Sequence, residues 1–216
     1  MYWIDKELYF PPVEQTSKEG IIAIGGDLSP ERLLLAYKNG IFPWFDDGDP
    51  ILWWCPADRM VLFPEEFKPS KSMRNIINRG VFTFTFNKAF REVMQNCQQI
   101  KREGQYGTWI TDEMIDSYTF LHEIGRAMSV EVWLNDELVG GLYGVDMETI
   151  FCGESMFSKV SNASKVAFYY LVQFLKANQY KLLDCQVYND HLASLGCREI
   201  PREDFLDILK SNSSSD

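Results

Sequence analysis

From about residue 60 onward, segments with helical periodicity alternate with segments that have the pattern of β-strands. Helical patterns cover residues 70–79, 87–99, 111–125, 162–178 and 190–195, and strand patterns cover residues 81–86, 130–134, 138–145, 150–157 and 182–187. Asn87 and Thr111 are expected to cap the helices that follow them, and Asn135-Asp136 predicts the turn of a hairpin. This alternation predicts a mixed sheet flanked by helices.

The first sixty residues differ from the rest because proline, glycine and tryptophan are dense there. One helix is clear: Ser29 is placed to cap it, Pro30 suits its first turn and Gly40 ends it. The remainder has the pattern of turns and short strands. We therefore expect an α+β protein with a small N-terminal α+β domain at residues 1–60, packed on a larger domain at residues 61–216.

Composition narrows the class of protein. Of the 216 residues, 46% are hydrophobic and 14% aromatic, which favours a folded globular chain over a disordered one. A net charge of −10 argues against broad, charge-driven binding of nucleic acid. The N-terminus lacks the pattern of a signal peptide and no apolar run has the length of a membrane span, so we expect a soluble, cytoplasmic protein.

The cysteines predict neither a disulfide framework nor a zinc site. They are odd in number, widely spaced and accompanied by only two histidines, and none forms a C-x-x-C motif: Cys55, Cys97, Cys152, Cys185 and Cys197. Reduced, mostly buried thiols are expected.

Two apolar segments each contain one carboxylate. Residues 181–187 carry Asp184 and, two positions later, Gln186, which share a face if the segment is a regular strand. Residues 151–158 carry Glu154. A buried carboxylate is unfavourable without a partner, so Asp184 is either an ion-paired core residue or a working group. Two such acids together suggest one polar site in an apolar cleft.

Three further features leave alternatives open. Trp44 and Trp109 lie in loop-like contexts, where they are either ordinary core residues or a slot for a flat ring, each stack contributing about 1–3 kcal/mol. The glycines at residues 140–144 indicate either close strand packing or a backbone that a ligand can approach. Lys71, Arg74 and Arg79 form either a solvated face or a landing site for phosphates.

Several longer strings resemble the leucyl/phenylalanyl-tRNA–protein transferase family, in order and over nearly the whole chain, from about Phe10 to Leu209. They occupy residues 25–30, 40–44, 50–54, 107–111, 129–133, 137–141, 152–158, 162–165, 184–187 and 193–196. The resemblance implies a GNAT-like acyltransferase domain behind a small N-terminal domain. It also implies transfer of Leu or Phe, with Met a further candidate, from aminoacyl-tRNA to proteins that begin with Arg or Lys, as part of bacterial N-end rule degradation.

The resemblance assigns roles by position. Asp184 and Gln186 match the catalytic pair, and Glu154 matches the acid beside it, here expected to favour a cationic acceptor. The aromatics around the terminal adenosine of tRNA correspond to Tyr37, Trp44, Trp109 and Tyr118. The aminoacyl pocket corresponds to Leu142, Phe151, Phe168, Leu175 and Leu183, and the tRNA-contacting basic stretch to Lys71, Arg74 and Arg79.

The chemistry that these residues would perform is aminolysis of an ester. We expect Asp184 to orient the acceptor amine or accept its proton, and Gln186 to fix geometry or polarise the ester carbonyl. The resemblance implies no cofactor and no metal, and we expect a monomer that does not bind membranes. The net charge of −10 predicts weak, salt-sensitive tRNA binding. Asn75 and Asn78, where the family is more basic, and a short polar C-terminus are departures from the family pattern that bear on the affinity for tRNA.

Two other functions remain open from the sequence. A GNAT-like N-acyltransferase that uses acyl-CoA is disfavoured because the sequence has no Arg/Gln-x-x-Gly-x-Gly/Ala loop between a strand and a helix. A catalytically silent tRNA-binding module is disfavoured because Asp184 and Gln186 are both present.

Overall fold

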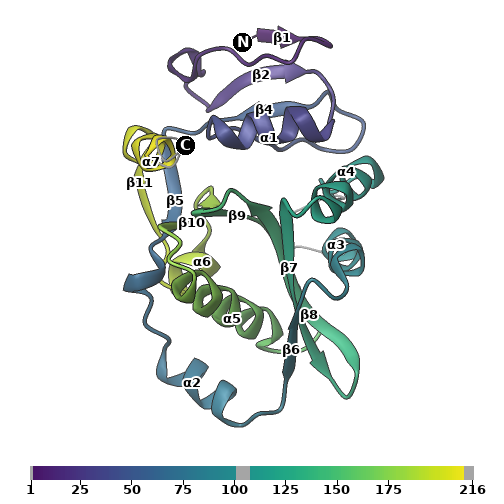
Figure 1. Cartoon of the computed structure of the whole chain (residues 1–216), viewed down its shortest axis with the longest axis vertical. Helices are drawn as coiled ribbons and strands as arrows, with labels where there is room; N and C mark the ends of the chain where they lie inside the picture. The colour runs from purple at the N-terminus through teal and green to yellow at the C-terminus, as the bar shows by residue number, and fades with distance from the viewer. Residues whose placement is uncertain (1, 101–107, 212–216) are drawn as a thin grey trace.

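Two β-sheets and seven α-helices make up the part of the chain that the computed structural model describes, residues 2–100 and 108–211 (Figure 1). A sheet with the strand order β1-β2-β4-β3 forms the N-terminal lobe, and a sheet with the order β11-β5-β10-β9-β8-β7-β6 forms the larger one. The strands are β1 (Tyr2–Ile4), β2 (Ile21–Gly25), β3 (Phe42–Pro43), β4 (Leu52–Trp54), β5 (Asp58–Leu62), β6 (Thr83–Phe86), β7 (Ala127–Leu134), β8 (Glu137–Asp146), β9 (Ile150–Ser158), β10 (Leu182–Gln186) and β11 (Arg198–Pro201). The fold is a mixed α/β arrangement with a small N-terminal lobe, as the sequence predicts.

The helices cover both faces of the large sheet. They are α1 (Pro30–Lys38), α2 (Lys71–Asn78), α3 (Phe90–Gln99), α4 (Asp112–Glu123), α5 (Ala163–Ala177), α6 (Asp190–Ser194) and α7 (Arg202–Lys210), with 3-10 turns at Val13–Gln15 and Pro64–Glu66. One hydrophobic core joins the N-terminal lobe to α3, α4 and α7, and the other lies under α5 on the opposite face (Figure 1). No helix within the described ranges is long and apolar enough to cross a membrane.

Most predicted elements are confirmed, and the local signals explain why. The side chains of Ser70 and Thr111 accept hydrogen bonds from the amides of Met73 and Met114, which caps α2 and α4. Asn135 and Asp136 both have positive φ (50° and 64°), the backbone conformation of the tight hairpin turn predicted between β7 and β8. The helix predicted in the N-terminal lobe is α1, with Ser29 at its N-cap and Pro30 in its first turn. The Ser29 side chain, however, makes no capping hydrogen bond, so this part of the prediction is wrong.

The predicted cap at Asn87 is wrong. Helix α3 begins at Phe90, and the Asn87 side chain instead accepts a hydrogen bond from the Ser129 amide at 3.0 Å. The amides of Lys88 and Ala89 donate to the buried carboxylate of Glu131, at 3.3 Å each. A carboxylate from a neighbouring strand thus holds the two amides that lead into α3, where the Asn87 side chain is expected to act.

The glycine-rich stretch of β8 serves close packing. A methyl group at Gly140 would come within 2.5 Å of the Ala163 Cβ, and one at Gly144 would collide with the Cys152 carbonyl oxygen. The packing interpretation is therefore confirmed. Strand β11 and helix α7 were not predicted. Gly104 and Gly107 indicate a turn in the sequence, and that segment and the polar tail beyond Ser211 lie outside the described residues.

Candidate active site

A cavity opens where β9 and β10 separate. The two strands pair in parallel from Leu182 and Ile150 to Asp184 and Cys152, and beyond that point β9 pairs only with β8. The cavity has a volume of about 510 Å³ and a mostly apolar wall formed by β8, β9, β10, α5, α6, the segment around β3, and Trp109. Separation of adjacent strands thus creates a space that the N-terminal lobe closes from one side.

Strand β10 ends in a bulge that turns Gln186 into this cavity. Its pairing with β5 shifts register between Asp184 and Gln186, and Gln186 has a φ of 66°. The Gln186 amide donates a hydrogen bond to Asp184 Oδ1 at 2.9 Å. The regular alternation assumed from the sequence is interrupted at Cys185, so the Gln186 side chain lines the cavity whereas the Asp184 side chain does not.

Asp184 is an ion-paired core residue. Its carboxylate is fully buried and bidentate with Arg59 of β5, at 2.8 Å (Nε to Oδ1) and 2.6 Å (Nη2 to Oδ2). Burial lowers the pKa of Arg59, but the adjacent carboxylate outweighs burial and raises that pKa above its ordinary value. The Asp184 charge is therefore compensated behind the cavity wall, and the carboxylate does not reach the cavity itself.

Glu154 of β9, in contrast, lines the cavity, and no cationic side chain among the described residues forms an ion pair with its carboxyl group. Gln186 Nε2 donates to its Oε1 at 2.8 Å, and the Tyr118 hydroxyl approaches its Oε2 at 3.5 Å. Burial raises the pKa of Glu154 to about 8; the charge of Asp184 adds to the rise, and hydrogen bonds from Tyr37 and Gln186 oppose it. Glu154 is therefore mostly protonated at pH 7 in the unliganded protein.

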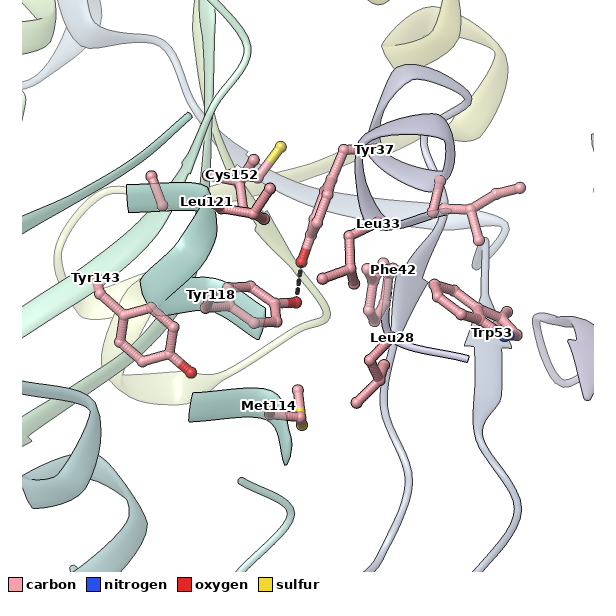
Figure 2. Close-up of a cluster of buried hydrophobic side chains, with 14 of the residues drawn as sticks. Leu28, Leu33, Tyr37, Phe42, Trp53, Met114, Tyr118, Leu121, Tyr143 and Cys152 are labelled. Atoms are coloured by element: carbon pink, nitrogen blue, oxygen red, sulfur yellow. Dashed lines mark hydrogen bonds between the residues drawn. The ribbon is translucent and has the colours of Figure 1, made fainter. Parts of the chain in front are cut away.

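Two buried phenols support Glu154 from behind. Tyr37 of α1 and Tyr118 of α4 share a hydrogen bond of 2.5 Å between their hydroxyl oxygens, across the junction of the two lobes (Figure 2). Burial, followed by the charge of Glu154, raises the pKa of both phenols well above the usual value. Both hydroxyls stay protonated at neutral pH and can donate within this network.

The structure brings some of the predicted binding residues together at the cavity. Of the four aromatics predicted around adenosine, Trp44 and Trp109 line it, whereas Tyr37 and Tyr118 are buried behind its wall. Among the residues predicted for the aminoacyl pocket, the cavity is lined by Leu142, Phe168 and Leu183, whereas Phe151 and Leu175 lie in the adjoining core.

The predicted basic stretch lies apart from the cavity. Lys71 and Arg74 are exposed on α2, and Arg79 is exposed at its C-terminal end. Helix α2 lies at the far end of the molecule from the N-terminal lobe and packs near α5 (Figure 1). None of the three side chains lines the cavity.

Sequence reasoning missed Arg59 and the cavity residues His191 and Met156. Arg59 had a detectable signal, because it is a lone cation at the start of an apolar strand, the complement of the lone acid in β10. Its pairing with Asp184 bridges 125 positions in sequence, which no local pattern reveals. Among the described residues, no group of three or more His, Cys, Asp or Glu side chains could hold a metal ion.

Comparison with known proteins settles the family. The model of the leucyl/phenylalanyl-tRNA protein transferase family matches residues 61–210, and the model of that family's N-terminal domain matches residues 26–57. The chain belongs to the leucyl/phenylalanyl-tRNA–protein transferase family. The resemblance found in the sequence is confirmed, and the chain is an aminoacyltransferase of a family that uses aminoacyl-tRNA and protein substrates.

Relatives of this family are similar over almost the entire chain. The transferase of Flavobacterium psychrophilum is 66% identical over 97% of this chain and 100% of its own length, and that of Flavobacterium johnsoniae is 65% identical over 98% and 100%. Among solved structures, L-PGS from Bacillus licheniformis is similar with a TM-score of 0.42 and 16% identity, over 77% of this chain and 53% of that one.

Proposed function

We propose that the cavity binds the 3′ end of Leu-tRNA or Phe-tRNA, with Met-tRNA a further candidate. The aminoacyl group passes to the α-amine of a protein that begins with Arg or Lys. The observation that carries this proposal is the hydrogen-bonded pair of Gln186 and Glu154 in the wall of a mainly apolar cavity that Trp44 and Trp109 also line. Membership in the transferase family supports it.

The cavity has separate features for the parts of the donor. Trp44 and Trp109 offer ring faces for the terminal adenine, and stacking on an aromatic side chain contributes about 1–3 kcal/mol per base. Leu142, Phe168 and Leu183 offer an apolar surface for the Leu or Phe side chain, since each buried methylene contributes about 0.8 kcal/mol. The exposed cations of α2 suit the tRNA backbone.

In the reaction, the acceptor nitrogen attacks the ester carbonyl carbon. The C–N bond forms, the bond to the ribose oxygen breaks, the amine loses a proton and the ribose hydroxyl gains one. An α-amine has a reference pKa of about 7.7–8.0, so a substantial fraction is already neutral near pH 7 and a strong base is not required. We assign the side-chain amide of Gln186 to hydrogen bonding with the ester or with the acceptor amine. Asp184 holds the backbone amide of Gln186 in place from behind the cavity wall.

Glu154 suits a role in selecting the acceptor. Burial raises its pKa, and a cationic acceptor that enters the cavity lowers that pKa and favours the charged form. A neutral first residue gains no such interaction. We therefore assign preference for N-terminal Arg or Lys to Glu154, and the short phenol pair of Tyr37 and Tyr118 to supporting its orientation.

The wider setting follows from this reaction. We propose that residues 61–216 form a GNAT-like catalytic domain and residues 1–60 a small N-terminal domain, although β5 already begins at Asp58. The separation of β9 from β10 at the cavity supports this assignment. The reaction belongs in the cytoplasm, where aminoacyl-tRNA is made, and marks its acceptors for N-end rule degradation.

The test is transfer of labelled Leu from Leu-tRNA to a peptide that begins with Arg, compared with the same peptide beginning with Ala. Transfer to the Arg peptide alone is the expected result. Equal transfer to both peptides contradicts the acceptor assignment. Transfer to neither, together with acylation of the peptides from an acyl-CoA, contradicts the proposed donor.

A further inference from the structure

The Arg59 guanidinium occupies a fully buried position at the junction of three elements. Besides its two hydrogen bonds to Asp184, Nη1 donates to the Gly40 carbonyl oxygen at 2.9 Å. The rings of Phe42 and Phe205 lie against the guanidinium, with centroids 4.8 and 4.5 Å from its central carbon. Its contacts therefore reach the large sheet, the N-terminal lobe and α7.

The two residues that Arg59 hydrogen-bonds, Asp184 and Gly40, each lie next to a segment that forms a wall of the cavity. Gly40 begins the segment that carries Trp44, whose amide is fixed by the Leu52 carbonyl oxygen at 2.9 Å. Asp184 holds the Gln186 amide, two residues further along the chain, at 2.9 Å. The Arg59 side chain thus connects the cavity wall proposed to bind adenine, at Trp44, with the cavity wall that carries the Gln186 side-chain amide.

We propose that Arg59 is a positioning residue that fixes the cavity wall at Trp44 relative to the cavity wall at Gln186. This inference rests on the proposed function. Donor binding and the transfer step then both depend on the Arg59 side chain. A planar guanidinium is suited to this task because its donors form a rigid fork that serves a carboxylate and a third acceptor at once. A lysine ammonium keeps the charge but cannot hold both acceptors in the same geometry.

The structure provides a matched control in Arg32, which is also a buried arginine. It is 1% exposed, pairs with Asp27 at 3.3 Å and donates to the Asp5 carbonyl oxygen at 2.8 Å, but its contacts lie within the N-terminal lobe away from the cavity. Arg59→Lys and Arg32→Lys therefore remove the same kind of fork at two places. Because Asp27 is 45% exposed whereas Asp184 is fully buried, the unfolding midpoint of each variant is measured beside the kinetics, and a loss of activity that only reflects weaker folding follows that midpoint.

The kinetic test measures kcat and the KM for Leu-tRNA in both variants, with Asp184→Asn beside them. For Arg59→Lys we expect kcat to fall about tenfold or more and the donor KM to rise about threefold, because small misplacements of reacting groups have large effects on rate. For Asp184→Asn we expect a decrease in kcat similar to that of Arg59→Lys, with little change in the KM for Leu-tRNA. Arg32→Lys should leave both constants within about twofold of wild type.

A second measurement does not depend on transfer activity. The backbone amide resonance of Gln186 in ¹⁵N spectra should shift in Arg59→Lys and stay in place in Arg32→Lys. If wild type shows no transfer but the resonance shifts as expected, the proposed function fails and the positioning role stands. If the Gln186 resonance is unchanged in Arg59→Lys, or if both constants match those of Arg32→Lys, the proposal is overturned.

Should Arg59→Lys fail to fold, Phe205→Leu provides the same test in weaker form. This change removes one of the two rings against the guanidinium while keeping the hydrogen-bonding groups. We expect a shift of the Gln186 resonance and a smaller decrease in kcat, of about threefold. An unchanged resonance with unchanged kcat overturns the positioning role.

Discussion

The two carboxylates on the neighbouring strands β9 and β10 have opposite environments. Asp184 faces away from the cavity and is neutralised by a bidentate arginine, whereas Glu154 faces the cavity, hydrogen-bonded to an amide and a phenol. The fully buried Asp184 is therefore an ion-paired structural group, whereas the half-buried Glu154 is an acid with a pKa of about 8. The partner, rather than the depth of burial, decides which of the two acids is available to a substrate.

The largest difference is expected in stability. Asp184→Ala leaves the fully buried Arg59 without its counter-ion, and breaking a buried pair by removing one partner typically costs about 3–5 kcal/mol. Glu154→Ala removes a group that is already neutral at pH 7, so we expect a much smaller loss. Urea unfolding at pH 7 measures both. Equal losses in the two variants would remove the distinction drawn between the two acids.

Trp109→Ala tests whether the cavity that Glu154 lines binds the donor. Loss of one stacking surface should weaken binding of the donor by about 1–3 kcal/mol, seen as a higher KM for Leu-tRNA. Phe120→Ala is a matched control, since this exposed aromatic lies on the adjacent helix α4 and does not line the cavity. A donor KM that rises equally in both variants contradicts the role assigned to Trp109.

The third effect concerns the proton on Glu154 and is seen as a change of stability with pH. Because its pKa is about 8 in the folded protein and near 4.5 in the unfolded chain, the folded state holds an extra proton between these values. The resulting stability is fully present below pH 4.5 and is lost as pH rises towards 8, with a slope of at most about 1.4 kcal/mol per pH unit.

Glu154→Gln removes this titration. The difference in free energy of unfolding between wild type and the variant should therefore change across pH 4.5–8, with wild type losing stability more steeply. Urea unfolding at several pH values measures it. Parallel curves for the two proteins mean that the Glu154 pKa is not raised.

The sequence could predict those parts of the molecule that depend on local chemistry. The cap at Thr111 and the turn at Asn135-Asp136 are satisfied by neighbouring atoms, so their residue types suffice. The cap of α3 could not be predicted, because Glu131 reaches it from another strand.

The same division holds at the candidate site. Asp184 and Glu154 stood out as lone acids in apolar runs, but the sequence could not say which of them is neutralised. That outcome depends on Arg59, 125 positions from Asp184, and on a bulge at Cys185 that separates the directions of Asp184 and Gln186. Tertiary pairing therefore decides the chemical character of residues that a pattern can only locate.

We propose that Gln186, rather than Asp184, contacts the substrate. The most direct measurement is the single-turnover rate of Leu transfer from Leu-tRNA to a saturating Arg peptide by Gln186→Asn. Asparagine tolerates the positive φ of this position, so the change withdraws the amide from the cavity while keeping the backbone and the Asp184–Arg59 pair. We expect a rate about 100-fold lower than that of wild type, with an unfolding midpoint close to wild type. A wild-type rate would contradict this proposal.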